Sequence, residues 1–199
     1  MTKWANDFVT ANSQLDWNLI WTTIHKNTMN YKVQSSIWEM VHRNFTCGYF
    51  LKLINLGDGI CKLCKRLEEK RTHIFMSCQV INAIYQQFMD ILLKLHNENV
   101  TDLEKAFGIY NIESERIMLR NYITYTIRHV VYRSRNLDTS QTGNIVSFLV
   151  NKIKYFIRKD LVERFQIYKN NNKTSIFVHM YLIEDILGKI TDNEIHFNI

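Results

Sequence analysis

Three cysteines and one histidine at short spacing are the residues of this sequence best suited to chemistry. Cys61, Cys64, His73 and Cys78 lie in the order Cys-x2-Cys-x8-His-x4-Cys. Three thiolates and one imidazole complete the tetrahedral shell that Zn²⁺ prefers, and they leave no position open for a substrate or a catalytic water. The first two cysteines can bind one ion from a single tight turn, and the longer loop returns the other two ligands to it. We therefore predict a structural Zn²⁺ site.

Two disulfides are the alternative use of four cysteines, the fourth being Cys47. The N-terminus has no apolar signal core, and no 18-residue apolar run marks a membrane span. We therefore expect reduced thiols, an intracellular location in cytoplasm and nucleus, and no membrane partner. The residues between the ligands are too polar to form a core unless a metal orders them. We interpret Cys47 as a structural or incidental thiol.

The distribution of apolar residues predicts a mainly α fold. The chain of 199 residues has no proline and only six glycines, so long helices can run without their strongest breaker. Apolar residues recur at helical spacing over 15–24, 33–41, 79–96, 117–135 and 145–165. We also expect Asp102 to cap a short helix, and 176–178 to be a short strand or the start of a helix.

The polar segment 97–101 is the best candidate for a domain boundary. We predict a small zinc-stabilised helical module (CCHC) over 1–96 and a basic, helical bundle-like region over 97–199. Polar loops are expected at 136–143 and 170–174.

The surroundings of the cluster resemble a known family. The residues that carry the likeness are Trp17-Asn-Leu-Ile-Trp21, Lys32, Trp38, His42, the Gly57–Gly59 turn and the four predicted ligands. This arrangement is similar to the zinc-binding region at the C-terminal end of LINE-type, non-LTR retrotransposon reverse transcriptases. The likeness covers roughly residues 14–165 and is most specific over 17–90. The segment 121–135 also resembles the helix that follows the zinc module in animal LINE proteins. Tyr85 and Phe88 stand where that family has tryptophan.

The resemblance implies a module that helps to bind template RNA or target DNA during target-primed reverse transcription, beside the rest of the retrotransposon protein. A reverse transcriptase needs an Asp-Asp pair for its catalytic metals, and no such pair occurs in this chain. We interpret the carboxylate pairs Asp160 with Glu163 and Glu184 with Asp185 as solvated charges. We therefore expect neither an enzyme nor a small-molecule substrate.

Basic residues provide candidate phosphate contacts, and the formal charge of +6 favours an acidic partner. Arginine can bind phosphate in a bidentate way, and tyrosine can stack on unpaired bases. The candidates between the predicted ligands are Lys62, Lys65, Arg66, Lys70 and Arg71. Those in the later helices are Arg128, Arg133, Arg135, Lys154 and Arg158. For each helix, the alternative is an ordinary solvated face opposite its apolar stripe.

Two other interpretations remain open. The chain could be a domesticated or orphan helical domain that binds proteins and no nucleic acid, or a remnant of a decayed element that still folds. Salt-dependent nucleic-acid binding would separate the first of these from the predicted function.

Overall fold

The computed structural model describes residues 15–27, 30–42, 44–137 and 144–199. Its elements, in chain order, are α2 (Trp17–Asn27), α3 (Tyr31–Val41), α4 (Gly48–Leu53), a π-helical turn (His73–Ser77), α5 (Gln79–Leu95), α6 (Asp102–Phe107), α7 (Glu115–Ser134), α8 (Ile145–Asn170), α9 (Thr174–Tyr181), a 3-10 turn (Ile183–Asp185), β1 (Gly188–Thr191) and β2 (Glu194–Phe197). The expected mainly α fold is confirmed. No helix of the described residues is both long and apolar enough to cross a membrane.

Side-chain caps fix where several helices begin. Asn30, Thr101, Ser114 and Asn144 each accept a hydrogen bond from a backbone N–H in the first turn of α3, α6, α7 and α8. Thr101 is therefore the cap of α6, and Asp102, which we predicted to cap it, is its first residue. The segment 176–178 lies within a helix, α9.

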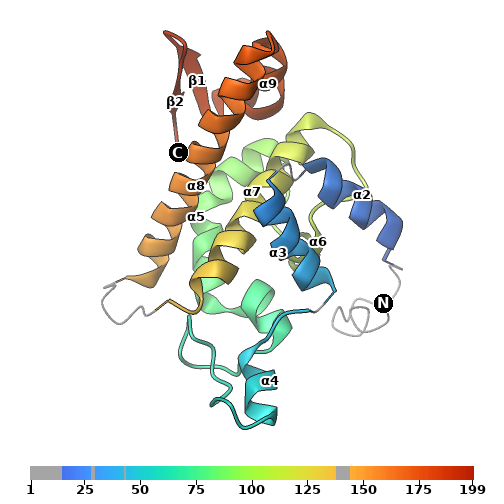
Figure 1. Cartoon of the computed structure of the whole chain (residues 1–199), viewed down its shortest axis with the longest axis vertical. Helices are drawn as coiled ribbons and strands as arrows, with labels where there is room; N and C mark the ends of the chain where they lie inside the picture. Colours follow the sequence, from blue (N-terminus) through green and yellow to red (C-terminus); the bar gives the residue numbers. More distant parts are fainter. Residues whose placement is uncertain (1–14, 28–29, 43, 138–143) are drawn as a thin grey trace.

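Helix α7 runs through the middle of the molecule and contacts α2, α3, α5, α6, α8 and α9 (Figure 1). Every residue from Arg120 to Val131 is buried. We expected accessible arginines on this helix, as phosphate contacts or as a solvated face, but neighbouring helices cover this stretch of α7.

Two apolar clusters form the core on opposite sides of α7. One unites α5, α8 and α9 with the cysteine ligands, and the other unites α2, α3 and α6 with the π-helical turn. Both clusters draw residues from before and after the predicted boundary at residues 96 and 97. The division into two domains stays a prediction.

A β-hairpin near the C-terminus was not predicted. Strands β1 and β2 are antiparallel, with Thr191 opposite Glu194. Asp192 and Asn193 both have positive φ angles, as the two central residues of a tight hairpin turn require. The Asp-Asn pair was the available signal for this turn.

Candidate metal centre

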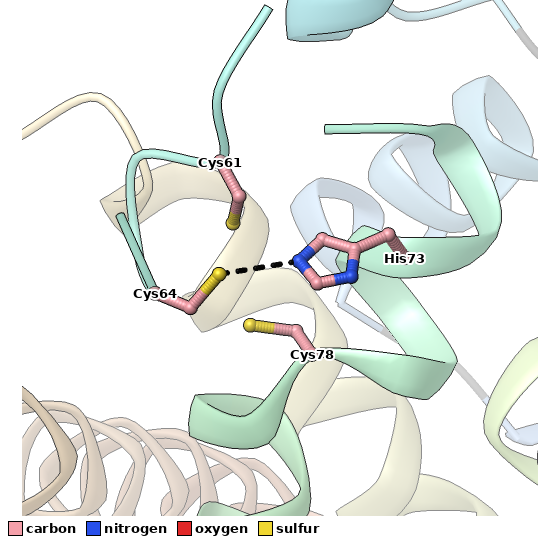
Figure 2. A group of neighbouring side chains, drawn as sticks. All are labelled: Cys61, Cys64, His73 and Cys78. Carbon is pink, nitrogen blue, oxygen red and sulfur yellow. Dashed lines mark hydrogen bonds between the residues drawn. The ribbon is translucent and has the colours of Figure 1, made fainter. Parts of the chain in front are cut away.

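The four predicted ligands converge on one buried point (Figure 2). Their ligand atoms lie within 4.8 Å of one another, and all four residues are buried. The four cysteines of the chain are free thiols, so the disulfide alternative is not realised in this structure. The zinc loop, defined as residues 59–72, supplies Cys61 and Cys64, while the π-helical turn and the residue after it supply His73 and Cys78.

A short hairpin in the zinc loop presents Cys61 and Cys64. The N–H of Cys61 donates to the carbonyl of Leu67 (2.8 Å), and the N–H of Glu69 donates to the carbonyl of Gly59 (2.7 Å). Gly59 has a φ of +81°, a conformation that favours glycine, so the Gly57–Gly59 signal marks a real turn. Leu63, between the two cysteines, is buried in the same core as α5 and α7. The hairpin is thus anchored to the body of the protein.

The π-helical turn explains how His73 and Cys78 reach one ion. Residues five apart on an α-helix point about 140° away from each other, because each residue turns the chain by about 100°. Here the N–H of Cys78 instead donates to the carbonyl of His73 (2.9 Å), which closes a wider turn around five residues. Both side chains therefore face the two cysteines. The sequence spacing alone gave no indication of this turn.

Burial and a shared hydrogen bond shift the pKa values of three of the four ligands. Cys61 and Cys78 share a hydrogen bond, which with burial raises the pKa of Cys61, whereas the bond from Cys61 lowers the pKa of Cys78. The N–H groups of Ile81 and Val80, at the N-terminus of α5, lower the pKa of Cys78 further. Burial lowers the pKa of His73, which favours the neutral imidazole that a metal ligand requires.

The geometry fits Zn²⁺. Bonds of about 2.3 Å to sulfur and about 2.0 Å to nitrogen place the two atoms about 3.5 Å apart across a tetrahedral angle. The Sγ atom of Cys64 lies 3.4 Å from Nε2 of His73. The other ring nitrogen, Nδ1, lies 3.5 Å from Oγ of Ser77, which orients the imidazole with Nε2 toward the metal. Four protein ligands would leave no open position, so the site holds Zn²⁺ for structure.

Glu69 is a buried residue of this site that the sequence did not reveal. Its Oε1 accepts from the N–H of Gly48 (2.9 Å), the first residue of α4, and its Oε2 lies 3.3 Å from the N–H of Lys62. Glu69 thereby joins α4 to the zinc loop. The available signal was the pair Glu68 and Glu69, the two acidic residues in a loop dominated by lysine and arginine.

Four of the ten candidate phosphate contacts lie exposed on the zinc loop: Lys62, Lys65, Arg66 and Lys70. Nζ of Lys62 donates to Asn136 (3.2 Å), and Arg66 donates to Gln79 (3.3 Å). Arg133, at the end of α7, is also exposed. Arg71 is half-buried, with its guanidinium 5.7 Å from the ring centre of Phe45.

The predictions for Arg128 and Arg135 are corrected because both side chains are buried. The guanidinium of Arg128 lies between the rings of Phe75 and Tyr125, at 5.9 and 5.5 Å from their centres. That of Arg135 lies 4.8 Å from the ring centre of Tyr132. Neither group faces solvent where a phosphate could approach.

On α8, Lys154 is half-buried and Arg158 is exposed. Arg158 donates to the backbone carbonyl of Ile199, so part of its donor capacity is used within the chain. The expected solvation of Asp160 is wrong. This carboxylate is buried and accepts from Arg164 (2.7 Å), Tyr122 (2.8 Å) and Asn30 (2.9 Å).

Of three comparisons with known proteins, one found a match. No curated protein and no solved structure matches the chain. Residues 2–85 match the model of a family described as zinc-binding in reverse transcriptase, and all four ligands lie within the matched residues. The matched segment is thus similar to the zinc-binding module associated with reverse transcriptases, and the buried Cys/His cluster within it supports a zinc-binding site.

Proposed function

We propose that this chain is a non-catalytic, zinc-stabilised module that binds nucleic acid. In the fuller form of the proposal, it is the C-terminal part of a non-LTR retrotransposon protein and assists binding of template RNA or target DNA in target-primed reverse transcription. Such a protein would act in cytoplasm and nucleus.

One observation carries the proposal: the loop that the metal closes also displays Lys62, Lys65, Arg66 and Lys70 to solvent. Ordering by the metal fixes these cations in one arrangement, which lowers the entropy lost when they contact phosphates. Phosphate contacts of this kind supply affinity with little sequence preference.

The charge balance of the loop supports this role. Among the described residues, no carboxylate lies within 4.0 Å of the charged nitrogens of Lys62, Lys65 or Arg66. Glu68 lies 3.4 Å from Lys52 and 3.6 Å from Lys70, and Glu69 is buried. Three cations are therefore left for an external anion.

Fluorescence anisotropy with a labelled single-stranded RNA of 30 nucleotides tests the proposal. The variant Lys62→Gln/Lys65→Gln/Arg66→Gln should bind about tenfold or more weakly at low salt. Its plot of log affinity against log salt should be shallower by about 2, because each phosphate contact on a single strand contributes about 0.7. The zinc content should stay unchanged.

A matched control removes three exposed cations elsewhere, as Lys94→Gln/Lys173→Gln/Lys189→Gln. This variant has the same net charge and should bind more tightly than the loop variant. Absence of affinity for both RNA and DNA at low salt, with one equivalent of zinc bound, would contradict the proposal.

A second candidate function is protein binding, and one apolar surface favours it. Six large side chains of α4 and the residues that follow it are exposed, namely Tyr49, Phe50, Leu53, Ile54, Leu56 and Leu67. Large exposed apolar side chains that gather in one part of a protein are typical of interaction surfaces. Helix α4 lies at the end of the molecule opposite the β-hairpin (Figure 1).

The natural occupant under this second proposal is the rest of the same retrotransposon protein. Calorimetric titration with a separately produced reverse-transcriptase domain tests it, with Leu53→Ser/Leu56→Ser as the surface variant. Loss of that binding together with retained RNA affinity would support two separate surfaces. Unchanged binding would exclude this face as the docking site.

A further inference from the structure

A groove distant in sequence from the zinc loop lies between the start of α3 and the middle of α8. Its volume is about 480 Å³. The α3 side contributes Asn30, Tyr31 and Lys32, and the α8 side contributes a longer set that includes Tyr155, Lys159, Glu163 and Ile167. The bond from Asn30 to Asp160 (2.9 Å) ties the two sides together and fixes the shape of the groove.

Two aromatic rings of the groove are unusually exposed. Tyr31 is 72% exposed and Tyr155 is 65% exposed, whereas most other aromatic side chains of the described residues are buried or half-buried. Burying a tyrosine ring on folding would stabilise the protein, so leaving two of them open in one groove indicates an external partner. A flat ring presents a surface on which an unpaired base can stack.

Lysines accompany both rings. Lys32 is exposed, with its Nζ 5.9 Å from the ring centre of Tyr31, and Lys159 is exposed one helical turn after Tyr155. The nearest carboxylate to Lys159, that of Glu163, is 3.9 Å away and equally exposed, so this pair contributes little. The lysine ammonium groups suit the phosphate of a nucleotide, and the tyrosine rings beside them suit its base.

The buried acidic group of the groove does not oppose an anion. The carboxylate of Asp160 is compensated by the guanidinium of Arg164 at 2.7 Å and accepts from Tyr122 and Asn30. Glu163 is therefore the one exposed carboxylate among the residues that line the groove, and it pairs only weakly with Lys159, whereas Lys32 and Lys159 supply two exposed ammonium groups. The exposed rim is weakly cationic.

We propose that this groove binds single-stranded nucleic acid, with bases stacked on Tyr31 and Tyr155 and phosphates beside Lys32 and Lys159. The inference rests on the proposed function and adds a second contact site to it. Because a duplex keeps its bases paired and stacked internally, the groove selects unpaired RNA or DNA over a duplex of equal charge. The groove would thereby distinguish single strands from duplexes. The zinc loop would not, because it contacts only phosphates.

Anisotropy with a 30-nucleotide single strand and with its duplex tests the groove on the full chain loaded with zinc. Tyr155→Ala should weaken single-strand binding by about fivefold or more, leave duplex binding unchanged, and leave the salt slope unchanged because no charge is lost. Tyr155→Phe should bind as the unaltered protein does, since the ring is retained. Equal losses for strand and duplex would overturn the stacking proposal.

Removing a positive charge and removing a negative charge at neighbouring positions of α8 should change the affinity in opposite directions. Lys159→Gln should weaken binding and reduce the salt slope, whereas Glu163→Gln should strengthen binding by removing a repulsive charge. Lys189→Gln, at an exposed position of β1, is the matched control and should behave as the unaltered protein. A Glu163→Gln variant that binds more weakly would contradict a phosphate in the groove.

Photocrosslinking locates the bound strand directly on the unaltered protein. A 5-bromouridine oligonucleotide should crosslink to the peptides that contain Tyr31 and Tyr155, and excess unlabelled single strand should suppress this. Crosslinks confined to the zinc loop, with groove variants that bind normally, would overturn the groove and leave the proposed function intact. Absence of binding by every nucleic acid would overturn both.

Discussion

Arg135, which follows the last residue of α7, forms a buried ion pair with Glu69 of the zinc loop. Nη1 of the arginine lies 3.5 Å from Oε1 of the glutamate, and both side chains are less than a tenth exposed. The same Oε1 accepts from the N–H of Gly48. One carboxylate thus connects the zinc loop, the start of α4 and the end of the central helix.

Glu69→Gln should destabilise the protein strongly, although glutamine has nearly the same shape as glutamate. It leaves the buried guanidinium of Arg135 without a charged partner, and removing one member of a buried pair costs about 3–5 kcal/mol. Urea denaturation measures the loss in unfolding free energy. Glu68→Gln is the matched control, because its partners are exposed lysines and the expected loss is under about 1 kcal/mol. Equal losses for the two variants would contradict the role given to Glu69.

Arg120→Lys should be more harmful than a conservative change suggests. The guanidinium is fully buried, contacts both oxygens of Glu104 at 2.7 and 2.8 Å, and donates to the carbonyls of Leu92, His96 and Glu98. An ammonium group cannot make this forked set of bonds. We expect a loss of about 3 kcal/mol or more in unfolding free energy. Arg116→Lys, at an exposed ion pair with Glu184, should change it by under about 1 kcal/mol.

Cys64→Ser should remove the metal and the order of the loop. Metal analysis of the purified protein should fall from about one equivalent of zinc to below half, since a serine hydroxyl is a poor zinc ligand. Hydrogen exchange should become fast over 59–78 while α8 stays protected. Cys47→Ala is the control, because Cys47 lies outside the cluster. Zinc content that is unaffected by Cys64→Ser would refute the closed site.

Acidification should destabilise the protein through His129. Burial, together with the positive charges of nearby Arg133 and Lys32, lowers the pKa of this imidazole from its usual 6.5 to about 4. In the unfolded chain, His129 therefore binds a proton as the pH falls below about 6.5, whereas in the folded chain it binds one only near pH 4. Stability should fall across that window, by up to about 3 kcal/mol, and level off below it.

His129→Phe should remove this part of the pH dependence while retaining a ring beside Phe156. Urea denaturation at pH 7.0, 5.5 and 4.5 measures it, and loss of zinc at low pH affects both proteins alike. The exposed His179 provides the control variant His179→Gln, which should keep the original pH profile. An unchanged profile in His129→Phe would assign the acid sensitivity to other groups.

The helices were predictable to the extent that each buries one face. The residues of α5 recur at helical spacing, and the helix begins at the predicted residue and ends one residue earlier than predicted. For α7 the same reasoning failed, because its polar residues are buried as well as its apolar ones. Arg120, for example, is satisfied by Glu104 and by carbonyls at the end of α5, and these partners cannot be paired with it from the sequence of α7 alone.

The sequence by itself determined the metal ligands, because thiolate and imidazole chemistry and short spacings are local properties that survive in any fold able to close the loop. Only the tertiary structure decided which cations can reach a ligand. Lys65 stays exposed on its loop, whereas Arg128 and Arg135 are covered by rings and helices brought from elsewhere in the chain. The groove has the same origin, since Asn30 and Asp160, which hold it together, are 130 residues apart. Burial depends on such distant neighbours, and no periodicity within one helix encodes them.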